Sequence, residues 1–291
     1  MKAMKKLAAL LLALTMVLAL CACSSQQTPT PTAEPSQAAE ENTAPAPENS
    51  EEAAEPAASF TTVEEGKLHM STNAAFPPYE MTTDDGKFEG IDVEVADAIA
   101  KKLGLELVVD DMSFDAALTA VQVGQSDIAM AGITVSESRL EVMDFSDSYA
   151  TGVQVIIVKE GSDIQTVDDL ENAELIGCQK ATTGYIYCSD TPENGGYGED
   201  HVIAYDTGAL AVMALVNGQV DCVVIDNEPA KAFVAENPGL TILDTEFAVE
   251  DYAIGFAKGN DALKDAVNAA MAELKADGTF QDIVDKYITA D

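Results

Sequence analysis

Between residues 67 and 132, apolar stretches of strand character alternate with stretches whose apolar residues recur at helical spacing. In order they are the strand-like KLHMST (67–72), the helix-like GIDVEVADAIAKKLG (90–104), the strand-like LELVVD (105–110), the helix-like SFDAALTAVQVG (113–124) and the strand-like SDIAMAG (126–132). Alternation on this scale is typical of βαβ units, in which helices cover a mostly parallel sheet. The sequence therefore predicts an α/β fold.

A second series of the same kind follows after about residue 150. In order, its strands and helices are ELIGCQ (174–179), TTGYIYCSD (182–190), HVIAYD (201–206), TGALAVMALVNG (207–218), VDCVVID (220–226), NEPAKAFVAEN (227–237) and LTILD (240–244). The chain closes with an amphipathic stretch (261–288) that predicts two helices broken at Gly278. We therefore expect two Rossmann-like α/β lobes.

The N-terminus has the pattern of an export signal. Lysines at positions 2, 5 and 6 precede the apolar run LAALLLALTMVLAL (7–20), which is shorter than the about 20 apolar residues of a membrane span. LALCAC (18–23) looks like a bacterial lipoprotein processing site, so we predict that residues 1–22 are removed and that Cys23 carries the lipid. The alternative is an ordinary secretory signal with two incidental cysteines.

Residues 23–59 predict a disordered, acidic, proline-rich tether, because such a composition buries too little apolar surface to offset the entropy of ordering.

The whole chain has a formal net charge of -36. This excess of acidic residues argues against nucleic acid and against adhesion to anionic lipid, both of which require clustered Lys and Arg. We therefore expect membrane contact through the lipid anchor only.

The sequence contains no pattern of a metal, cofactor or catalytic site. Cys178, Cys188 and Cys222 are odd in number, so they allow at most one disulfide, and we interpret them as buried thiols. His69 and His201 are isolated, and HExxH, GxSxG and phosphate-loop patterns are missing from the sequence. We expect no cofactor, no metal and no enzymatic activity.

Arg139, at the end of GITVSESR (132–139), is the only arginine in a chain with 51 acidic residues. Its loop leaves the carboxyl end of a predicted strand, which is where open α/β sheets bind ligands. Asp226 ends a strand at the matching place in the second series. A guanidinium facing a carboxylate suits a zwitterion. The alternative is a surface ion pair with Glu137 or Glu141, worth about 0 to 1 kcal/mol.

Other strand ends carry compatible residues. Asn73 and Phe76 follow the first strand, and Phe114 begins the helix after another. Thr182 and Thr183 stand at a strand-to-helix junction, where free N–H groups can bind anions. Five strand ends therefore converge on chemistry suited to one small ligand.

From about residue 60 to its end, the chain resembles the extracellular solute-binding proteins of polar amino acid ABC importers, the group that includes glutamine-, histidine- and lysine/arginine/ornithine-binding proteins. The motifs behind the resemblance are STNAAFPPYE, GKFEGIDVEVADAIAKKLG, DIAMAGITVSESR, MDFSDSY, CQKATTG, VVIDNEPA and YAIGFAKGN. The resemblance implies the type II periplasmic binding protein fold, with two lobes that close around the ligand about two hinge strands. We expect the hinge crossings near 149–153 and 248–252, lobe 1 at 60–150 plus 251–291, and lobe 2 at 151–250.

The resemblance also implies the site. Its candidate residues are Asn73, Phe76, Phe114, Gly132, Thr134, Arg139, Gln179, Thr182, Thr183 and Asp226. Arg139 would hold the ligand carboxylate, helped by backbone N–H groups of Thr134 and Thr183. The carbonyl of Gly132, the hydroxyl of Thr134 and the carboxylate of Asp226 would hold the α-ammonium. Phe76 and Phe114 would sandwich the side chain, and Asn73 and Gln179 would face its distal end.

Neutral polar ligands such as glutamine fit these residues best. Relatives that select cationic side chains commonly carry an acid where this chain has Asn73, and strand alternation turns Lys180 away from the pocket. Small neutral and sulfur-containing amino acids stay open.

The expected protein is a monomeric, lipid-anchored binding component on the outer face of the bacterial cytoplasmic membrane, which delivers its ligand to an ABC permease. Two alternatives are an amino-acid-sensing or adhesive surface lipoprotein and, on the same fold, an enzyme of the cyclohexadienyl dehydratase type.

Overall fold

The protein is described by a computed structural model that covers residues 59–288. The predicted signal peptide, Cys23 with its lipid, and all of the predicted tether except its last residue lie outside these residues. Within residues 59–288, no helix is both long and apolar enough to cross a membrane.

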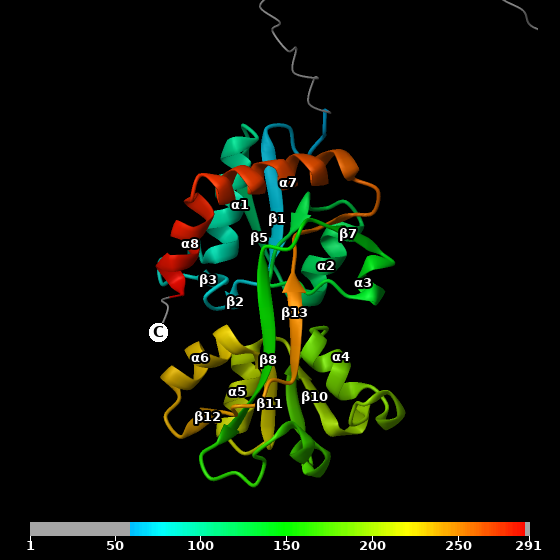
Figure 1. Cartoon of the computed structure of the whole chain (residues 1–291), viewed down its shortest axis with the longest axis vertical. Helices are drawn as coiled ribbons and strands as arrows, with labels where there is room; N and C mark the ends of the chain where they lie inside the picture. Colours follow the sequence, from blue (N-terminus) through cyan, green and yellow to red (C-terminus); the bar gives the residue numbers. More distant parts are fainter. Residues whose placement is uncertain (1–58, 289–291) are drawn as a thin grey trace, which may run out of the picture. The chain divides into compact units, whose positions relative to one another are not determined.

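The first lobe is built on a five-stranded sheet of order β5-β1-β6-β14-β7 (Figure 1). Its strands are β1 (Lys67–Thr72), β5 (Glu106–Asp111), β6 (Ile128–Ala129), β7 (Met143–Phe145) and β14 (Gly255–Ala257). Its helices are α1 (Ile91–Lys102), α2 (Phe114–Gln122), α3 (Glu137–Leu140), α7 (Asp261–Ala276) and α8 (Thr279–Tyr287). A small sheet of β2 (Ala75–Phe76), β3 (Glu80–Thr82) and β4 (Phe88–Glu89) lies beside it. β1 pairs in parallel with β5 and β6, whereas β14 runs antiparallel to β6 and β7.

The second lobe is built on a six-stranded sheet of order β10-β9-β11-β8-β12, in which β13 also pairs with β8. Its strands are β8 (Ala150–Lys159), β9 (Ile176–Gln179), β10 (Val202–Tyr205), β11 (Cys222–Asp226), β12 (Leu240–Ile242) and β13 (Ala248–Tyr252). Its helices are α4 (Thr183–Ser189), α5 (Gly208–Val216) and α6 (Asn227–Glu236), with short 3-10 turns η1 (Val167–Asn172), η2 (Pro192–Asn194) and η3 (Glu199–His201).

The long strands β8 and β13 connect the two lobes (Figure 1). They pair antiparallel from Gln154 opposite Ala248 to Ala150 opposite Tyr252. After β13 the chain returns to the first lobe, where Lys102 of α1 forms ion pairs with Glu273 and Asp277 at the end of α7. This arrangement confirms the predicted fold class of two α/β lobes joined by two hinge strands.

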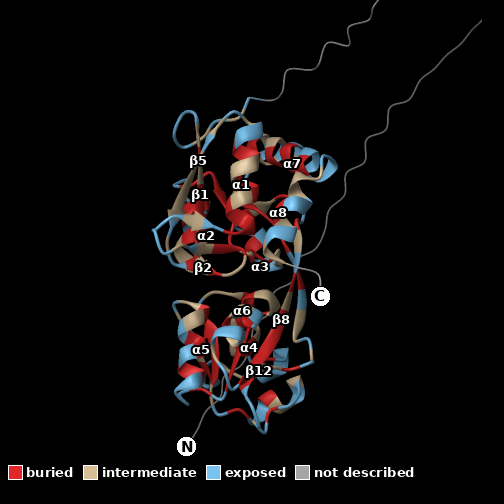
Figure 2. Cartoon of the chain, turned by 90° about the vertical axis from the view of Figure 1, so that its left-hand side faces the viewer, coloured by how far each residue is buried: buried red, intermediate tan, exposed pale blue. Residues whose placement is uncertain are grey.

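Local sequence explains most of these elements. In α1, apolar residues such as Val95 and Ile99 are buried against the sheet, acidic residues occupy the first turn, and Lys101 and Lys102 occupy the last, which suits the helix dipole. Figure 2 shows the resulting buried layer in each lobe. One prediction was too long: the stretch 126–132 is a strand only at Ile128–Ala129, because the backbone turns at Gly132.

The three cysteines are free and buried in the second lobe. Cys178, Cys188 and Cys222 belong to one apolar cluster with Ile156 and Leu170. Burial contributes to raising the pKa of Cys222, which keeps its thiol protonated and unreactive.

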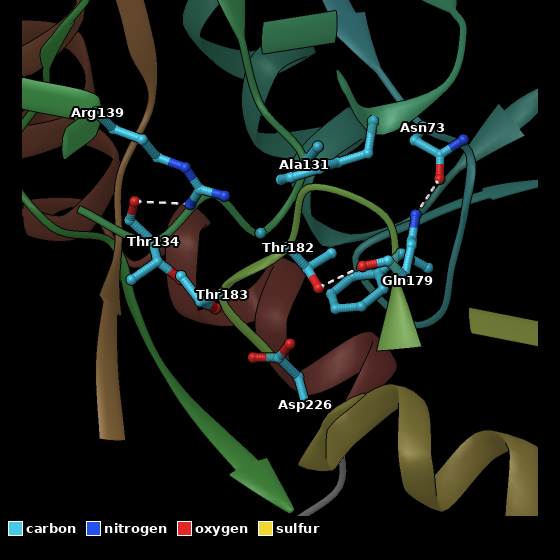
Figure 3. Close-up of a pocket in the computed structure, with 11 residues that line it drawn as sticks. Asn73, Ala131, Thr134, Arg139, Gln179, Thr182, Thr183 and Asp226 are labelled. Carbon is cyan, nitrogen blue, oxygen red and sulfur yellow. Dashed lines mark hydrogen bonds between the residues drawn. The ribbon is translucent and has the colours of Figure 1, made fainter. Parts of the chain in front are cut away.

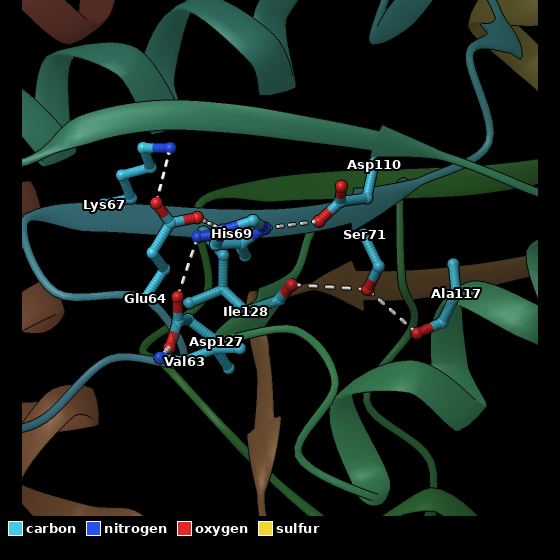
Figure 4. A network of polar contacts seen from close by, with 9 residues as sticks. All are labelled: Val63, Glu64, Lys67, His69, Ser71, Asp110, Ala117, Asp127 and Ile128. Carbon is cyan, nitrogen blue, oxygen red and sulfur yellow. Dashed lines mark hydrogen bonds and ion pairs between the residues drawn. The ribbon is translucent and has the colours of Figure 1, made fainter.

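A polar network fastens the start of the described chain to β1 (Figure 4). The Asp127 carboxylate accepts the backbone N–H groups of Val63 and His69, each at 2.7 Å. The His69 ring lies between two carboxylates, with Nδ1 2.9 Å from Asp110 and Nε2 3.4 Å from Glu64. Partial burial acts to lower the pKa of His69, but these carboxylates outweigh it and raise the pKa above its usual value.

This network predicts a pH-dependent contribution of His69 to stability. Because the folded pKa lies above the unfolded value, the contribution is fully present below about pH 6.5 and is lost as the pH rises through the folded pKa. Chemical denaturation of wild type and His69→Gln should therefore show a difference in the free energy of unfolding that is largest under mildly acidic conditions. His201→Gln is the control for loss of an exposed imidazole. A difference for His69→Gln that stays constant from about pH 5.5 to about pH 9 would contradict the prediction.

Candidate functional site

One pocket lies at the ends of strands β1, β5 and β6 of one lobe and β9 and β11 of the other. Figure 3 shows the side chains that line it. The pocket is lined by Asn73, Phe76, Phe114, Ala131, Gly132, Thr134, Arg139, Gln179, Thr182, Thr183 and Asp226. Every candidate residue predicted from the sequence lies on this lining, and Ala131 is the one addition. The structure thus brings the predicted set together around one pocket.

The turn after β6 depends on glycine. Gly132 has a φ of +53°, and a Cβ at this position would lie 2.9 Å from the Phe76 ring. Its N–H donates to the Asp92 carboxylate at 3.0 Å, and the Tyr149 hydroxyl donates to the same oxygen at 2.8 Å. The buried Asp92 carboxylate therefore holds the turn in place, and the missing Cβ of Gly132 leaves room for the Phe76 ring beside the pocket.

Arg139 lies inside the pocket and is only 6% exposed. Its Nη1 donates to the Thr134 carbonyl at 2.9 Å, and its Nη2 reaches the Ala181 carbonyl in the other lobe at 3.1 Å. The guanidinium carbon stands 5.4 Å from the centre of the Phe114 ring. The alternative of a surface ion pair is therefore wrong: no carboxylate of residues 59–288 lies within 4.0 Å of this guanidinium.

Asp226 ends β11 on the opposite side of the pocket and occupies the N-cap position of α6, where its side chain makes no capping hydrogen bond. One of its carboxylate oxygens accepts the Tyr252 hydroxyl, and the other accepts the Gln154 amide at 2.7 Å. Burial raises the pKa of Asp226 to about 7, and the carboxylate of Glu250 adds to the rise. The buried Asp226 therefore lacks a cationic partner among residues 59–288.

The hinge strands supply residues that the sequence analysis missed. Gln154 of β8 and Glu250 and Tyr252 of β13 are buried and form the floor beneath Thr134, Thr183 and Asp226. Gly152 makes room for Tyr252, because a Cβ at this position would overlap the Tyr252 ring. The one sequence feature that could have indicated such residues is a polar side chain inside an apolar strand, as with Gln154 in GVQVIIV (152–158).

The opposite end of the pocket is closed by two amides. Asn73 donates Nδ2 to the Met112 carbonyl at 2.8 Å, so its oxygen faces Gln179, which donates Nε2 to it at 2.9 Å. A carbonyl can only accept, so the Met112 carbonyl fixes the orientation of both amides. Lys180 points outward, as strand alternation predicted, and pairs with Asp115 at 2.8 Å.

The two threonines at the start of α4 differ. The Thr182 hydroxyl caps the helix, accepting the Tyr185 N–H at 3.4 Å and donating to the Gln179 carbonyl at 2.8 Å. The Thr183 hydroxyl instead points to the floor and donates to Glu250 at 2.8 Å. Thr182 therefore shapes the turn, whereas Thr183 belongs to the floor network.

The lobes touch across the pocket, which has a volume of about 20 Å³. That is about the room of one water molecule. Hydrogen bonds from Arg139 to Ala181 and from Gln179 to Asn73 join the two lobes across the pocket. A larger solute can enter only when the lobes separate and these donors turn to it. Within residues 59–288, no three His, Cys, Asp or Glu side chains are grouped to hold a metal ion.

The sequence and the fold both have relatives among known proteins. Residues 68–290 match the bacterial extracellular solute-binding proteins, family 3. The chain is 30% identical over 226 residues to a probable histidine-binding protein of Neisseria gonorrhoeae, covering 76% of this chain and 83% of that protein. It is 31% identical over 232 residues to the L-cystine-binding protein of Escherichia coli K12, covering 78% and 85%. Among solved structures, an ancestral arginine-binding protein bound to glutamine superposes with a TM-score of 0.72 at 36% identity, covering 78% of this chain and all of that one.

The close fit of the hinge predicts that Gly152→Ala is destabilising. The added methyl group overlaps the Tyr252 ring, and overpacking of a filled core costs about 1 to 3 kcal/mol. Urea unfolding should show a loss in this range, whereas Thr151→Ala, at the exposed neighbouring position, should stay within about 0.5 kcal/mol of wild type. Equal stability of Gly152→Ala and wild type would mean that Tyr252 does not occupy this place.

Proposed function

This chain belongs to family 3 of the bacterial extracellular solute-binding proteins, and we propose that it captures a polar, neutral, glutamine-like amino acid and delivers it to the permease of an ABC importer. Lobe 1 (60–150 and 251–291) would close on lobe 2 (151–250) around the solute. The observation that carries the proposal is the buried guanidinium of Arg139 facing the buried carboxylate of Asp226, without an ion pair between them.

An α-amino acid supplies the charge that each of these groups lacks. Its carboxylate would take the two donors that Arg139 now gives to the Thr134 and Ala181 carbonyls. Planar, bidentate pairing of this kind is the strong form of the hydrogen bond. Its ammonium would stand by Asp226, with the Gly132 carbonyl and the Thr134 hydroxyl as further acceptors. Phe76 and Phe114 provide apolar walls for the carbon chain between the charged and distal ends.

Closure follows from the same contacts. A solute held by Arg139 of one lobe and Asp226 of the other binds the closed form better than the open one, so it shifts the population toward closure. The permease would then distinguish loaded from empty protein by shape. We place the protein, as a monomer, on the outer face of the bacterial cytoplasmic membrane, held by the lipid on Cys23 and by the tether.

The distal amides support a neutral side chain that ends in N–H groups. Asn73 donates to the Met112 carbonyl and Gln179 donates to the Asn73 oxygen, so the Asn73 oxygen keeps one lone pair and the Gln179 oxygen keeps its lone pairs for a solute. A carboxylate would place acceptors against acceptors, and a cationic side chain would find no carboxylate on the pocket lining near Asn73. An amide such as that of glutamine satisfies these acceptors without burying another charge. The solved relative named above, an ancestral arginine-binding protein, is bound to glutamine in its structure.

A thermal-shift screen of the chain without its signal peptide against the twenty amino acids tests the proposal. L-glutamine should raise the melting temperature, because a ligand at a hundred times its Kd stabilises the folded state by about 2.7 kcal/mol. L-glutamate, of nearly the same size, is the matched comparison and should give a smaller shift. If no amino acid shifts the melting temperature, the proposed function fails; a larger shift with L-glutamate would refute only the neutral-side-chain proposal.

Arg139→Lys should weaken amino acid binding strongly while the chain stays folded. Lysine keeps the charge but loses the two-pronged donor, and a hydrogen bond to a charged group is worth about 1.5 to 3 kcal/mol, or a factor of roughly 10 to 150 in Kd. Calorimetry measures the loss. Lys101→Ala, which removes an exposed cation whose ion pair with Asp97 lies within helix α1 of lobe 1, is the control and should bind as wild type does. Wild-type affinity in Arg139→Lys would remove the carboxylate from this site.

A further inference from the structure

Glu250 is a buried carboxylate in the middle of hinge strand β13, 6% exposed. A single one of its oxygens accepts from three side chains: the Thr183 hydroxyl at 2.8 Å, the Thr134 hydroxyl at 3.0 Å and the Gln154 amide at 3.1 Å. These donors come from the second lobe, the first lobe and the other hinge strand. One carboxylate oxygen thus joins all the parts of the protein that meet at the pocket.

Because Glu250 accepts these hydrogen bonds, it determines whether the Thr134 and Thr183 hydroxyls act as donors or as acceptors toward a solute. A hydroxyl has one proton and two lone pairs. When Thr134 and Thr183 donate their protons to Glu250, the lone pairs of Thr134 are left for the pocket. Thr183 uses one lone pair to accept the Gln154 amide at 3.4 Å and keeps the other, and the two hydroxyl oxygens stand 3.4 Å apart. A neutral group in place of the carboxylate would let these hydroxyls rotate and present a proton instead. A presented proton repels an ammonium and favours a carboxylate.

The same carboxylate fixes Gln154. This amide directs its nitrogen at Glu250 and at the Asp226 oxygen 2.7 Å away. Its oxygen therefore has to point away from both acids, toward Gly184, where a Cβ would lie only 2.9 Å from it. Glu250 thereby fixes the orientation of the Gln154 amide, which in turn donates to Asp226. Its other oxygen has no hydrogen-bond partner within residues 59–288 although it is buried.

We propose that Glu250 is a positioning residue that selects solutes with an α-ammonium, by turning the hydroxyls of Thr134 and Thr183 into acceptors and by fixing Asp226 through Gln154. The inference rests on the proposed function, because it assigns the ammonium end of that site. The negative charge of Glu250 also favours solutes that carry an α-ammonium. Glu250 is the carboxylate that acts most strongly on Arg139, so it tempers the attraction of the site for solutes that carry a carboxylate alone.

The alternative is that Glu250 only stabilises the hinge, in which case its loss would weaken every solute alike. The two roles are separated with L-glutamine and glutaramate, which is glutamine without its α-ammonium. If the wild-type protein binds L-arginine rather than L-glutamine, L-arginine and 5-guanidinopentanoate form the equivalent pair. Kd is measured by calorimetry for the amino acid and by competition for its partner, together with the melting temperature of each variant.

Glu250→Gln keeps the size of the side chain and removes the charge. We expect Kd for L-glutamine to rise about tenfold or more, from loss of charge-assisted hydrogen bonds, and Kd for glutaramate to stay level or fall. The preference for the amino acid therefore drops by at least about tenfold. Asp251→Asn is the control, since Asp251 lies exposed on the other face of the same strand and should leave the preference unchanged.

Glu250→Asp covers the case in which the glutamine variant does not fold. It keeps the charge but withdraws the carboxylate by one methylene, so it cannot reach all three donors and should show the same selective loss. An unchanged preference in either folded variant, or an equal loss for both solutes, would overturn the proposal. Failure of the wild-type protein to bind any amino acid would instead overturn the proposed function, so the two failures are distinguishable.

Discussion

The burial of the Arg139 guanidinium between two lobes is the constraint around which the rest of the site is organised. Removing a charge from water costs several kcal/mol unless other groups replace its hydration. Here two backbone carbonyls, the face of Phe114 and the field of two nearby carboxylates provide that replacement. None of these is a direct ion pair within residues 59–288. The guanidinium is thus tolerated but keeps its capacity for a carboxylate.

The floor of the site belongs to the hinge, and this joins binding to movement. Gln154, Glu250 and Tyr252 share one face of the paired strands β8 and β13, so their side chains meet Asp226, Thr134 and Thr183 directly. A change in the angle between the lobes must alter these hydrogen bonds. Gly152, with no side chain, is what permits such close packing in strands that also have to bend.

Local sequence could predict most of the fold and the pocket lining, because each candidate residue stands next to a strand or helix boundary that the apolar pattern marks. Parallel strands bring such boundaries to one edge within each sheet, which groups Asn73 with Phe114 and Thr183 with Asp226. That the two edges face each other, with Gln179 opposite Asn73, is implied by the resemblance to a two-lobed family. The floor could not be found in this way. Glu250 and Gln154 lie inside strands, and which face they present depends on the pairing of segments almost a hundred residues apart.

Under the proposed function, Asp226 would make closure favourable only when the site is occupied. Without a cation beside it, burial raises the pKa of this carboxyl to about 7, so near neutral pH the closed lobes hold either an unfavourable buried charge or a bound proton. The ammonium of the proposed solute supplies the missing countercharge and removes that penalty. The net charge of -36 has little effect on an electrically neutral zwitterion but repels an anion. The negative field thus disfavours an anionic solute, whereas the proposed preference for a neutral over a cationic side chain rests on the Asn73 and Gln179 amides.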